Sequence, residues 1–263
     1  SLHDALPICP MVEVIGQEGR YDYILASHVI EHTPNMLGFL NDCATLLKDN
    51  GTLVLAVPDK RYCFDYFRPT TSTGDIIQAF REKRTRHTAG ALFDHFAYVT
   101  RRGDAIVWLS RSEAPFDFIH DTAQAADIIS RIDHNEEYID CHAWQFTASS
   151  FRLILSDLHS IGLLSLREQE FHETGEFEFY AALSKNGPGC PLNRLTLAEK
   201  AQVEGTQIRP ARPLVEATAG DLPPAVHAAT PPPPSPARAA TPMRKMRKAL
   251  KRMRRSLAGE KAK

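Results

Sequence analysis

The stretch Tyr21-Asp22-Tyr23-Ile24-Leu25-Ala26-Ser27-His28-Val29-Ile30-Glu31-His32 decides the fold that the sequence predicts. Residues 21–26 form an apolar run of strand length, and the small and polar residues Ser27 and His28 follow it. This pattern is typical of a buried parallel strand that delivers polar groups to a site at its carboxyl end. We therefore predict a strand here, with candidate functional groups directly after it.

A helix and a second strand are predicted to follow. Thr33 is a suitable N-cap, Pro34 suits the first turn, and Asn50-Gly51 is expected to end the helix. Residues 53–57 are apolar at every position, which indicates a strand covered on both faces. Strand, helix and strand at this spacing form a βαβ unit, so we predict two parallel neighbouring strands.

The segment 58–142 is less regular, and we predict a long insertion there with helices near 73–83 and 122–132. Thr147 is then expected to cap a helix with one apolar stripe that ends at Gly162. Residues 163–171 and 177–183 are predicted strands, the second with alternate apolar residues on one face. They fit a terminal hairpin added to a parallel sheet, so the predicted fold class is α/β.

Composition divides the chain near residue 186. Residues 186–242 are rich in Pro and Ala and are predicted to form a disordered linker. The last part, 243–263, carries ten Lys or Arg against one acidic residue, so the formal net charge of −1 hides a basic tail and an acidic body. Apolar residues recur at helical spacing over 243–257, which predicts a basic amphipathic helix at 243–258.

The partner of this predicted helix stays open. An anionic membrane surface or a protein partner is favoured, no specific nucleic acid is expected, and a solvated arm is the alternative. The five cysteines include no close pairs, and the chain has no signal peptide and no apolar run of about 18 residues. We therefore expect a cytoplasmic protein, with a peripheral position at the inner membrane face as an option.

The first eight residues are interpreted as a cloning or library scar. Residues 1–8 can be written in codons that resemble the end of a sequencing adapter, and a natural N-terminus is the alternative. The partial domain is therefore predicted to span 9–185.

The opening stretch and the later Leu47-Lys48-Asp49-Asn50-Gly51-Thr52-Leu53 resemble the fourth and fifth strands of class I S-adenosylmethionine (SAM)-dependent methyltransferases. Residues 58–69, 94–95 and 138–147 are similar to a subgroup of these enzymes found beside bacterial glycan-assembly genes. The resemblance covers roughly 21–183 and implies the C-terminal part of a Rossmann-like doubly wound sheet. It also implies SAM as the cofactor, with Ser27 and His28 near it.

The family's Gly-rich turn after the first strand cannot be located before Tyr21. Gly16 and Gly19 lie in a polar stretch with no preceding strand. Such a turn lets the backbone approach the cofactor, so we expect an N-terminally truncated fragment that binds SAM weakly or not at all and is inactive by itself.

Methyl transfer needs near-attack geometry and, for most acceptors, removal of a proton. His28 is the candidate general base, and a helix-start histidine bonded to backbone is the alternative. Glu31 and His32 are expected to brace the loop. The candidate acceptor-binding residues are charged groups or histidines, namely Asp59, Lys60, Arg61, Asp65, Arg68, Asp94, His95, Asp140 and His142.

Two interpretations of the charges over 59–68 remain open: a pocket for a saccharide or phosphate, and ion pairs that lock the insertion onto the sheet. The Asp-His pairs at 94–95 and 140–142 lack the spacing of known metal motifs, so no metal is expected. The predicted function is SAM-dependent O-methylation of a saccharide or related cell-surface precursor. The alternative is a noncatalytic interaction module that has lost cofactor binding and is tethered by its basic C-terminal helix.

Overall fold

The computed structural model describes residues 11–109, 112–134 and 138–206. The predicted scar at 1–8, most of the predicted linker and the predicted basic helix at 243–258 lie outside the described residues. Within the described part, no helix is long and apolar enough to cross a membrane.

The predicted βαβ unit is present. Strand β1 (Tyr21–Ser27) lies parallel to β2 (Leu47–Pro58), and the two are linked by the 3-10 turn η1 (Ile30–His32) and helix α3 (Met36–Leu46). Gly51 makes the close approach possible, because a Cβ there would lie 2.8 Å from the carbonyl oxygen of Tyr21.

The predicted boundaries of this helix were wrong at both ends. Asn35 is the N-cap of α3, and its side chain accepts a hydrogen bond from the amide of Gly38. Thr33 instead ends η1, where its hydroxyl donates to the carbonyl of Ile30. At the other end, the chain is already extended at Leu47, so Asn50 and Gly51 belong to β2. Thr33 and Asn35 are both suitable N-cap residues and lie two positions apart, which explains why the helix starts later than predicted.

A hairpin completes the four-stranded sheet, whose order is β1-β2-β6-β5. Strands β5 (Arg167–Glu173) and β6 (Glu178–Ser184) are antiparallel, and β6 is also antiparallel to β2. The predicted terminal hairpin is therefore confirmed, although its first strand begins at Arg167 and not at residue 163. Every residue of β6 is buried, in contrast to the predicted one-sided alternation, because β6 lies inside the sheet.

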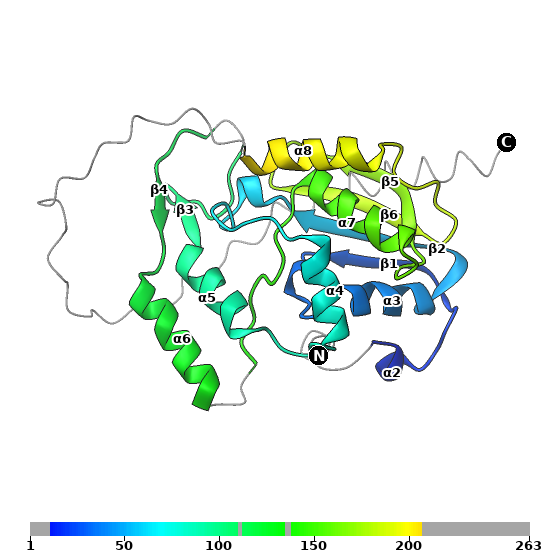
Figure 1. Ribbon diagram of the computed structural model, residues 1–263, viewed down its shortest axis with the longest axis horizontal. Coiled ribbons are helices and arrows are strands. Elements are labelled where there is room, and N and C mark those ends of the chain that lie inside the picture. Colours follow the sequence, from blue (N-terminus) through cyan, green and yellow to red (C-terminus); the bar gives the residue numbers. More distant parts are fainter. Residues whose placement is uncertain (1–10, 110–111, 135–137, 207–263) are drawn as a thin grey trace, which may run out of the picture. The chain divides into compact units, whose positions relative to one another are not determined.

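One face of the sheet carries the core. Helices α3, α4 (Thr73–Arg81) and α7 (Ala148–Ser160) supply apolar side chains that pack on alternate residues of β2 and β6. These helices lie in front of the strands in Figure 1. On the other face of β1, Tyr23 and Leu25 are exposed. The described residues therefore show helices packed into the core on one face only, and the doubly wound arrangement stays a prediction.

The predicted insertion contains more structure than expected. Its two predicted helices are α4 and α6 (Thr122–His134), and between them lie helix α5 (Ala89–Tyr98) and the short strands β3 (Thr100–Arg102) and β4 (Phe116–Phe118). Helices α5 and α6 lie beside each other, away from the strands of the main sheet (Figure 1).

The C-terminal part of the described chain corrects the predicted linker boundary. Residues 194–206 form helix α8 (Arg194–Thr206), which packs on α7 through a buried Leu197. The amide and hydroxyl of Ser149 both donate to the carboxylate of Glu204, at 2.9 and 2.6 Å. The start of the linker at residue 186 was therefore wrong, because an average composition dominated by Pro and Ala hid one local helix.

Helix α7 follows the sequence prediction closely. The hydroxyl of Thr147 accepts from the amide of Ser150 at its start, and Gly162 has a φ of +75° directly after its end. A short helix, α2 (Met11–Ile15), precedes β1 and packs near α3.

Candidate functional site

Two loops leave the same edge of the sheet, where the parallel strands β1 and β2 end. The register pairs Ser27 with Ala56, and the amide of His28 donates to the carbonyl of Ala56 at 3.0 Å. The backbone then turns sharply, since His28 has a φ of +52°. A left-handed conformation costs a residue other than glycine about 1–2 kcal/mol, so packing around this loop must hold it in place.

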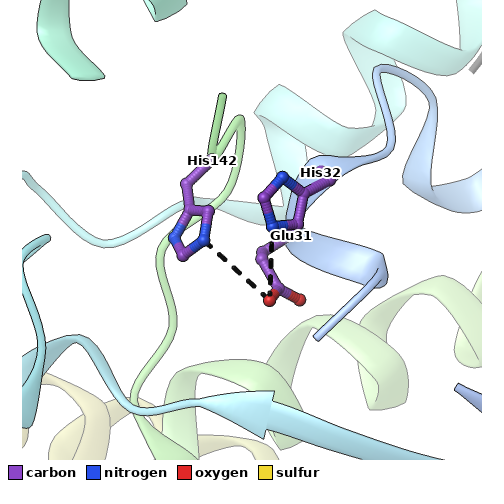
Figure 2. A group of neighbouring side chains, drawn as sticks. All are labelled: Glu31, His32 and His142. Carbon is purple, nitrogen blue, oxygen red and sulfur yellow. Dashed lines mark ion pairs between the residues drawn. The ribbon is translucent and has the colours of Figure 1, made fainter. Parts of the chain in front are cut away.

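Glu31 lies at the centre of the candidate site. Its side chain is 0% exposed, and neither carboxylate oxygen has a hydrogen-bond partner among the described residues. Oε1 lies 3.6 Å from Nδ1 of His28, 3.8 Å from Nε2 of His32 and 4.0 Å from Nε2 of His142. Figure 2 shows the two Nε2 atoms directed at the same carboxylate oxygen. Burial raises the pKa of Glu31 above its ordinary value, although the neighbouring histidines act against this.

A second carboxylate lies close to the other nitrogen of each ring, as a hydrogen-bond partner of His142 and as an ion-pair partner of His32. Nδ1 of His142 lies 2.5 Å from Asp65, and Nδ1 of His32 lies 2.9 Å from Asp140. Burial alone would raise the pKa of Asp65, but the charges of His142 and Arg68 and the hydrogen bond to His142 lower it overall. The pKa of Asp140 is lowered too: the hydrogen bonds to His32 and His87 outweigh its burial.

His28 stands at the more open side of this cluster, with a side chain that is 37% exposed. Its Nε2 lies 2.9 Å from Oε2 of Glu178, and the hydroxyl of Tyr180 donates to the other oxygen of Glu178 at 2.5 Å. Burial lowers the pKa of His28, but the hydrogen bond to Glu178 and the charges of Glu31 and Glu178 raise it above its ordinary value. Ser27 is exposed beside it. The arrangement holds an imidazole at the strand end, with Nε2 bonded to Glu178 and Nδ1 at 3.6 Å from Glu31, too far for a hydrogen bond.

The charges that follow β2 are largely paired within the chain. Arg61 donates from Nε and Nη2 to the carboxylate of Asp59, at 2.9 and 2.6 Å. The buried Lys60 donates from Nζ to the carbonyl of Tyr66 at 2.8 Å. Arg68 donates to Asp65 at 3.1 Å and to the carbonyl of His142 at 2.6 Å. These contacts favour the interpretation that the charges lock the insertion onto the sheet, and acceptor binding by them stays a prediction.

The remaining predicted residues divide between the cluster and its surroundings. His95, on α5, accepts a hydrogen bond at Nδ1 from the amide of His142, and its ring lies 5.9 Å from that of His142. Burial lowers the pKa of His95 to about 4. Asp94 is half-buried on the same helix, and no contact shown for the described residues links it to the cluster. The structure thus brings His28, Asp65, His95, Asp140 and His142 together.

Glu178 was not among the residues predicted from the sequence, and Glu31 and His32 were predicted only to brace the loop. Glu31 and His32 follow the deciding strand directly, so their position was a usable signal. Glu178 carried none, because it reaches the site only through the pairing of Pro58 with Glu178 across β2 and β6.

The described residues provide only part of a SAM site. Ser27 and His28 stand at the strand end where the resemblance puts them. Gly16 and Gly19 have φ values of +65° and +61°, but they connect α2 to β1, and the amide of Gly16 donates to the carbonyl of Val12 as at a helix end. They therefore do not form a turn after a strand, and no described turn before β1 fits the cofactor.

Comparison with known proteins shows that residues 6–120 are similar to a family described as "Methyltransferase domain", whose sequence model they match. Particular relatives match shorter stretches. A "Ubiquinone biosynthesis O-methyltransferase" of Rhodopseudomonas palustris (strain HaA2) is 42% identical over 60 residues, which is 22% of this chain and 24% of that protein. The protein of the same name from Bradyrhizobium diazoefficiens is 37% identical over 54 residues, or 20% of this chain and 21% of that protein. The chain thus spans a quarter or less of the length of the curated relatives it matches.

Proposed function

We propose that this protein takes part in SAM-dependent methyl transfer to an acceptor oxygen. The observation that carries the proposal is the parallel pair β1–β2, which lies within the stretch matched by the methyltransferase family and ends at His28. The relatives that match this chain are named as O-methyltransferases, which supports oxygen as the acceptor atom.

His28 is proposed to remove the proton from the acceptor hydroxyl. With Nε2 held by Glu178, Nδ1 is the nitrogen left to accept a proton. Glu178 fixes the ring and stabilises the imidazolium that forms, while Tyr180 holds Glu178 in place. SAM supplies the methyl group when it is bound. Because the described residues form only part of a site for it, the roles proposed here are limited to the residues of this chain.

The proposed acceptor is a hydroxyl of a saccharide or related cell-surface precursor, as the resemblance of residues 58–69 and 138–147 implies. The names of the relatives point to ubiquinone biosynthesis, which is the competing acceptor class. Both acceptors offer an oxygen to the same imidazole, so the mechanism proposed for His28 is common to them.

The test is methyl transfer by the product of the gene's complete reading frame. That protein is incubated with isotope-labelled SAM and cell extract, and labelled products are separated into saccharide and quinone fractions. Label in the saccharide fraction supports the proposal, and label confined to the quinone fraction overturns the acceptor assignment. A protein that does not bind SAM supports the noncatalytic interaction module.

His28→Ala tests the base. General-base catalysis contributes about 10²–10⁴-fold, so the rate should fall by that factor while SAM binding is retained. His159→Ala is the matched control, because His159 lies on α7 and bonds the carbonyl of Leu164, outside the cluster. Unchanged transfer by His28→Ala would rule out this role.

A further inference from the structure

We propose that Glu31, His32 and His142 bind a divalent transition-metal ion of the Zn²⁺ or Co²⁺ type. Their ligand atoms all lie within 4.8 Å of one another, and the three side chains converge from η1 and from the segment before α7 (Figure 2). From the sequence no metal was expected, because the Asp-His pairs at 94–95 and 140–142 lack the spacing of known metal motifs, and Glu31 and His32 were not considered as ligands.

The separations are too long for hydrogen bonds and suit a shared ion. Oε1 of Glu31 lies 3.8 and 4.0 Å from the Nε2 atoms of His32 and His142, whereas an N–H···O hydrogen bond spans about 2.7–3.2 Å. Two ligands that each lie about 2.1 Å from a tetrahedral metal are separated by about 3.4 Å. Inward movements of a few tenths of an ångström would bring both histidine–carboxylate pairs to that spacing.

In a neutral ring whose proton sits on Nδ1, an electron pair and not a proton faces the centre. Each Nδ1 lies against a carboxylate, that of Asp65 or Asp140, so a neutral ring carries its proton there. Nε2 of each ring then presents a lone pair toward Glu31, whose own oxygens are acceptors. Three acceptors aimed at one point repel one another unless a cation or a proton lies between them.

The surrounding groups match the outer shell of a metal site. Histidines that bind metals almost always donate their other ring N–H to a carboxylate or carbonyl, which fixes the ring and raises its basicity. Here Asp65 is the hydrogen-bond partner of His142 and also accepts from Arg68, while Asp140 forms an ion pair with Nδ1 of His32. Phe64 packs against the ring of His142 at 4.6 Å and supplies an apolar wall.

The donor set selects the kind of ion. Two imidazoles and one carboxylate suit Zn²⁺, Co²⁺ or Fe²⁺, whereas Mg²⁺ and Ca²⁺ prefer oxygen ligands throughout. Three protein ligands leave a further coordination position, as in catalytic zinc sites. The partly exposed His28 and His32 give an ion a route from solvent to the buried carboxylate.

The alternative is a buried Glu31 that is simply protonated and holds no ion. The two cases differ in what Glu31→Gln does, since glutamine keeps the volume of glutamate but is a poor metal ligand. A ligand role predicts loss of metal binding, and a protonated carboxyl predicts no change in it.

The experiment measures metal binding by the full chain. The purified protein is stripped with a chelator and titrated with Zn²⁺ by calorimetry and with Co²⁺ by visible absorption, which reports the ligands around the ion. Stoichiometric binding is expected, with an affinity that falls by more than about 100-fold in Glu31→Gln and by about 10–100-fold in Asp140→Asn. Thermal unfolding of each variant without metal checks that it is folded.

Matched controls separate this site from general metal binding. Glu168→Gln alters a buried carboxylate that pairs with Arg152, and His159→Ala removes a histidine elsewhere, so both should bind metal like the parent chain. Failure of the parent chain to bind either ion stoichiometrically would overturn the proposal, as would equal binding by Glu31→Gln. Neither result depends on methyl transfer, so the proposed function can fail while this inference holds.

Discussion

The loops that follow β1 and β2 leave the same edge of the sheet, but their buried charged side chains differ in how they are paired. After β2, Asp59 pairs with Arg61 and Asp65 pairs with Arg68, each within three residues along the chain. After β1, the side chain of Glu31 is fully buried, and neither of its carboxylate oxygens accepts a hydrogen bond from a described residue. A buried charge that is paired locally stabilises the fold, whereas a buried carboxylate without a hydrogen bond requires an explanation, and we propose a bound ion.

The difference extends to where the partners originate. The β2 loop carries its own counterions, so its ion pairs form whenever the loop takes its shape. The β1 loop depends on Asp140, His142 and Glu178, which reach it from other parts of the fold. Only the complete tertiary structure assembles the second group.

The largest effect on stability should come from breaking a buried ion pair in the loop after β2. Arg68→Ala leaves the buried carboxylate of Asp65 without its cation, and removing one partner of a buried pair costs about 3–5 kcal/mol. The free energy of unfolding, measured by urea denaturation, should fall by that amount. A loss below about 1 kcal/mol would mean that His142 alone can hold Asp65.

A smaller loss of unfolding free energy is expected when a tryptophan that donates a hydrogen bond to one of the two loops is replaced. The indole of Trp144 donates to the carbonyl of Thr33 at 2.6 Å, and that of Trp108 donates to the carbonyl of Arg61 at 3.2 Å. Trp144→Phe should lower the free energy of unfolding by about 2 kcal/mol, because a buried carbonyl loses its donor. Trp108→Phe is the matched variant after β2, and its longer bond predicts the smaller loss. The reverse order in urea denaturation would contradict the comparison.

Glu31→Gln should act in the opposite direction on stability. Replacing an unpartnered buried carboxylate by a neutral amide removes a desolvation cost, so metal-free protein should be unchanged or more stable by about 1 kcal/mol. Glu168→Gln, which weakens the pair with Arg152, should instead be destabilising. The midpoints of urea unfolding of the two variants check the sign. Destabilisation by both would indicate that Glu31 has a structural partner.

The smallest effect is expected at an exposed pair. Arg101 lies 2.6 Å from Asp117 in the β3–β4 hairpin, with both side chains about half exposed or more. Arg101→Ala should change the free energy of unfolding by less than about 1 kcal/mol, because water screens such pairs. A loss as large as that of Arg68→Ala would show that burial is not what distinguishes these pairs.

The strands and main helices of the sheet could be predicted because their signals are local. The run at 21–26, the apolar residues at 53–57 and the cap at Thr147 each determine an element by themselves. Helix α8 and the β3–β4 hairpin were missed, since composition or irregular patterning concealed them. The central position of β6 is a tertiary property that its own alternation cannot reveal.

The candidate site could be predicted only in part. His28 follows a strand, and Asp140 and His142 form a visible pair, but the structure exchanges their partners. Asp65, and not Asp140, holds His142, while Asp140 holds His32. Such pairings depend on how the insertion folds over the sheet, and no spacing in the sequence encodes them.

The position of β6 also affects how the chain can be made. During synthesis, β1, α3 and β2 emerge before β6, so the second edge of β2 stays unpaired until residues 178–184 have left the ribosome. At about 5–20 residues per second, this delay lasts several seconds or longer. An unpaired apolar strand edge can pair with other chains and aggregate. Nascent chains of this protein should therefore need chaperones during that interval.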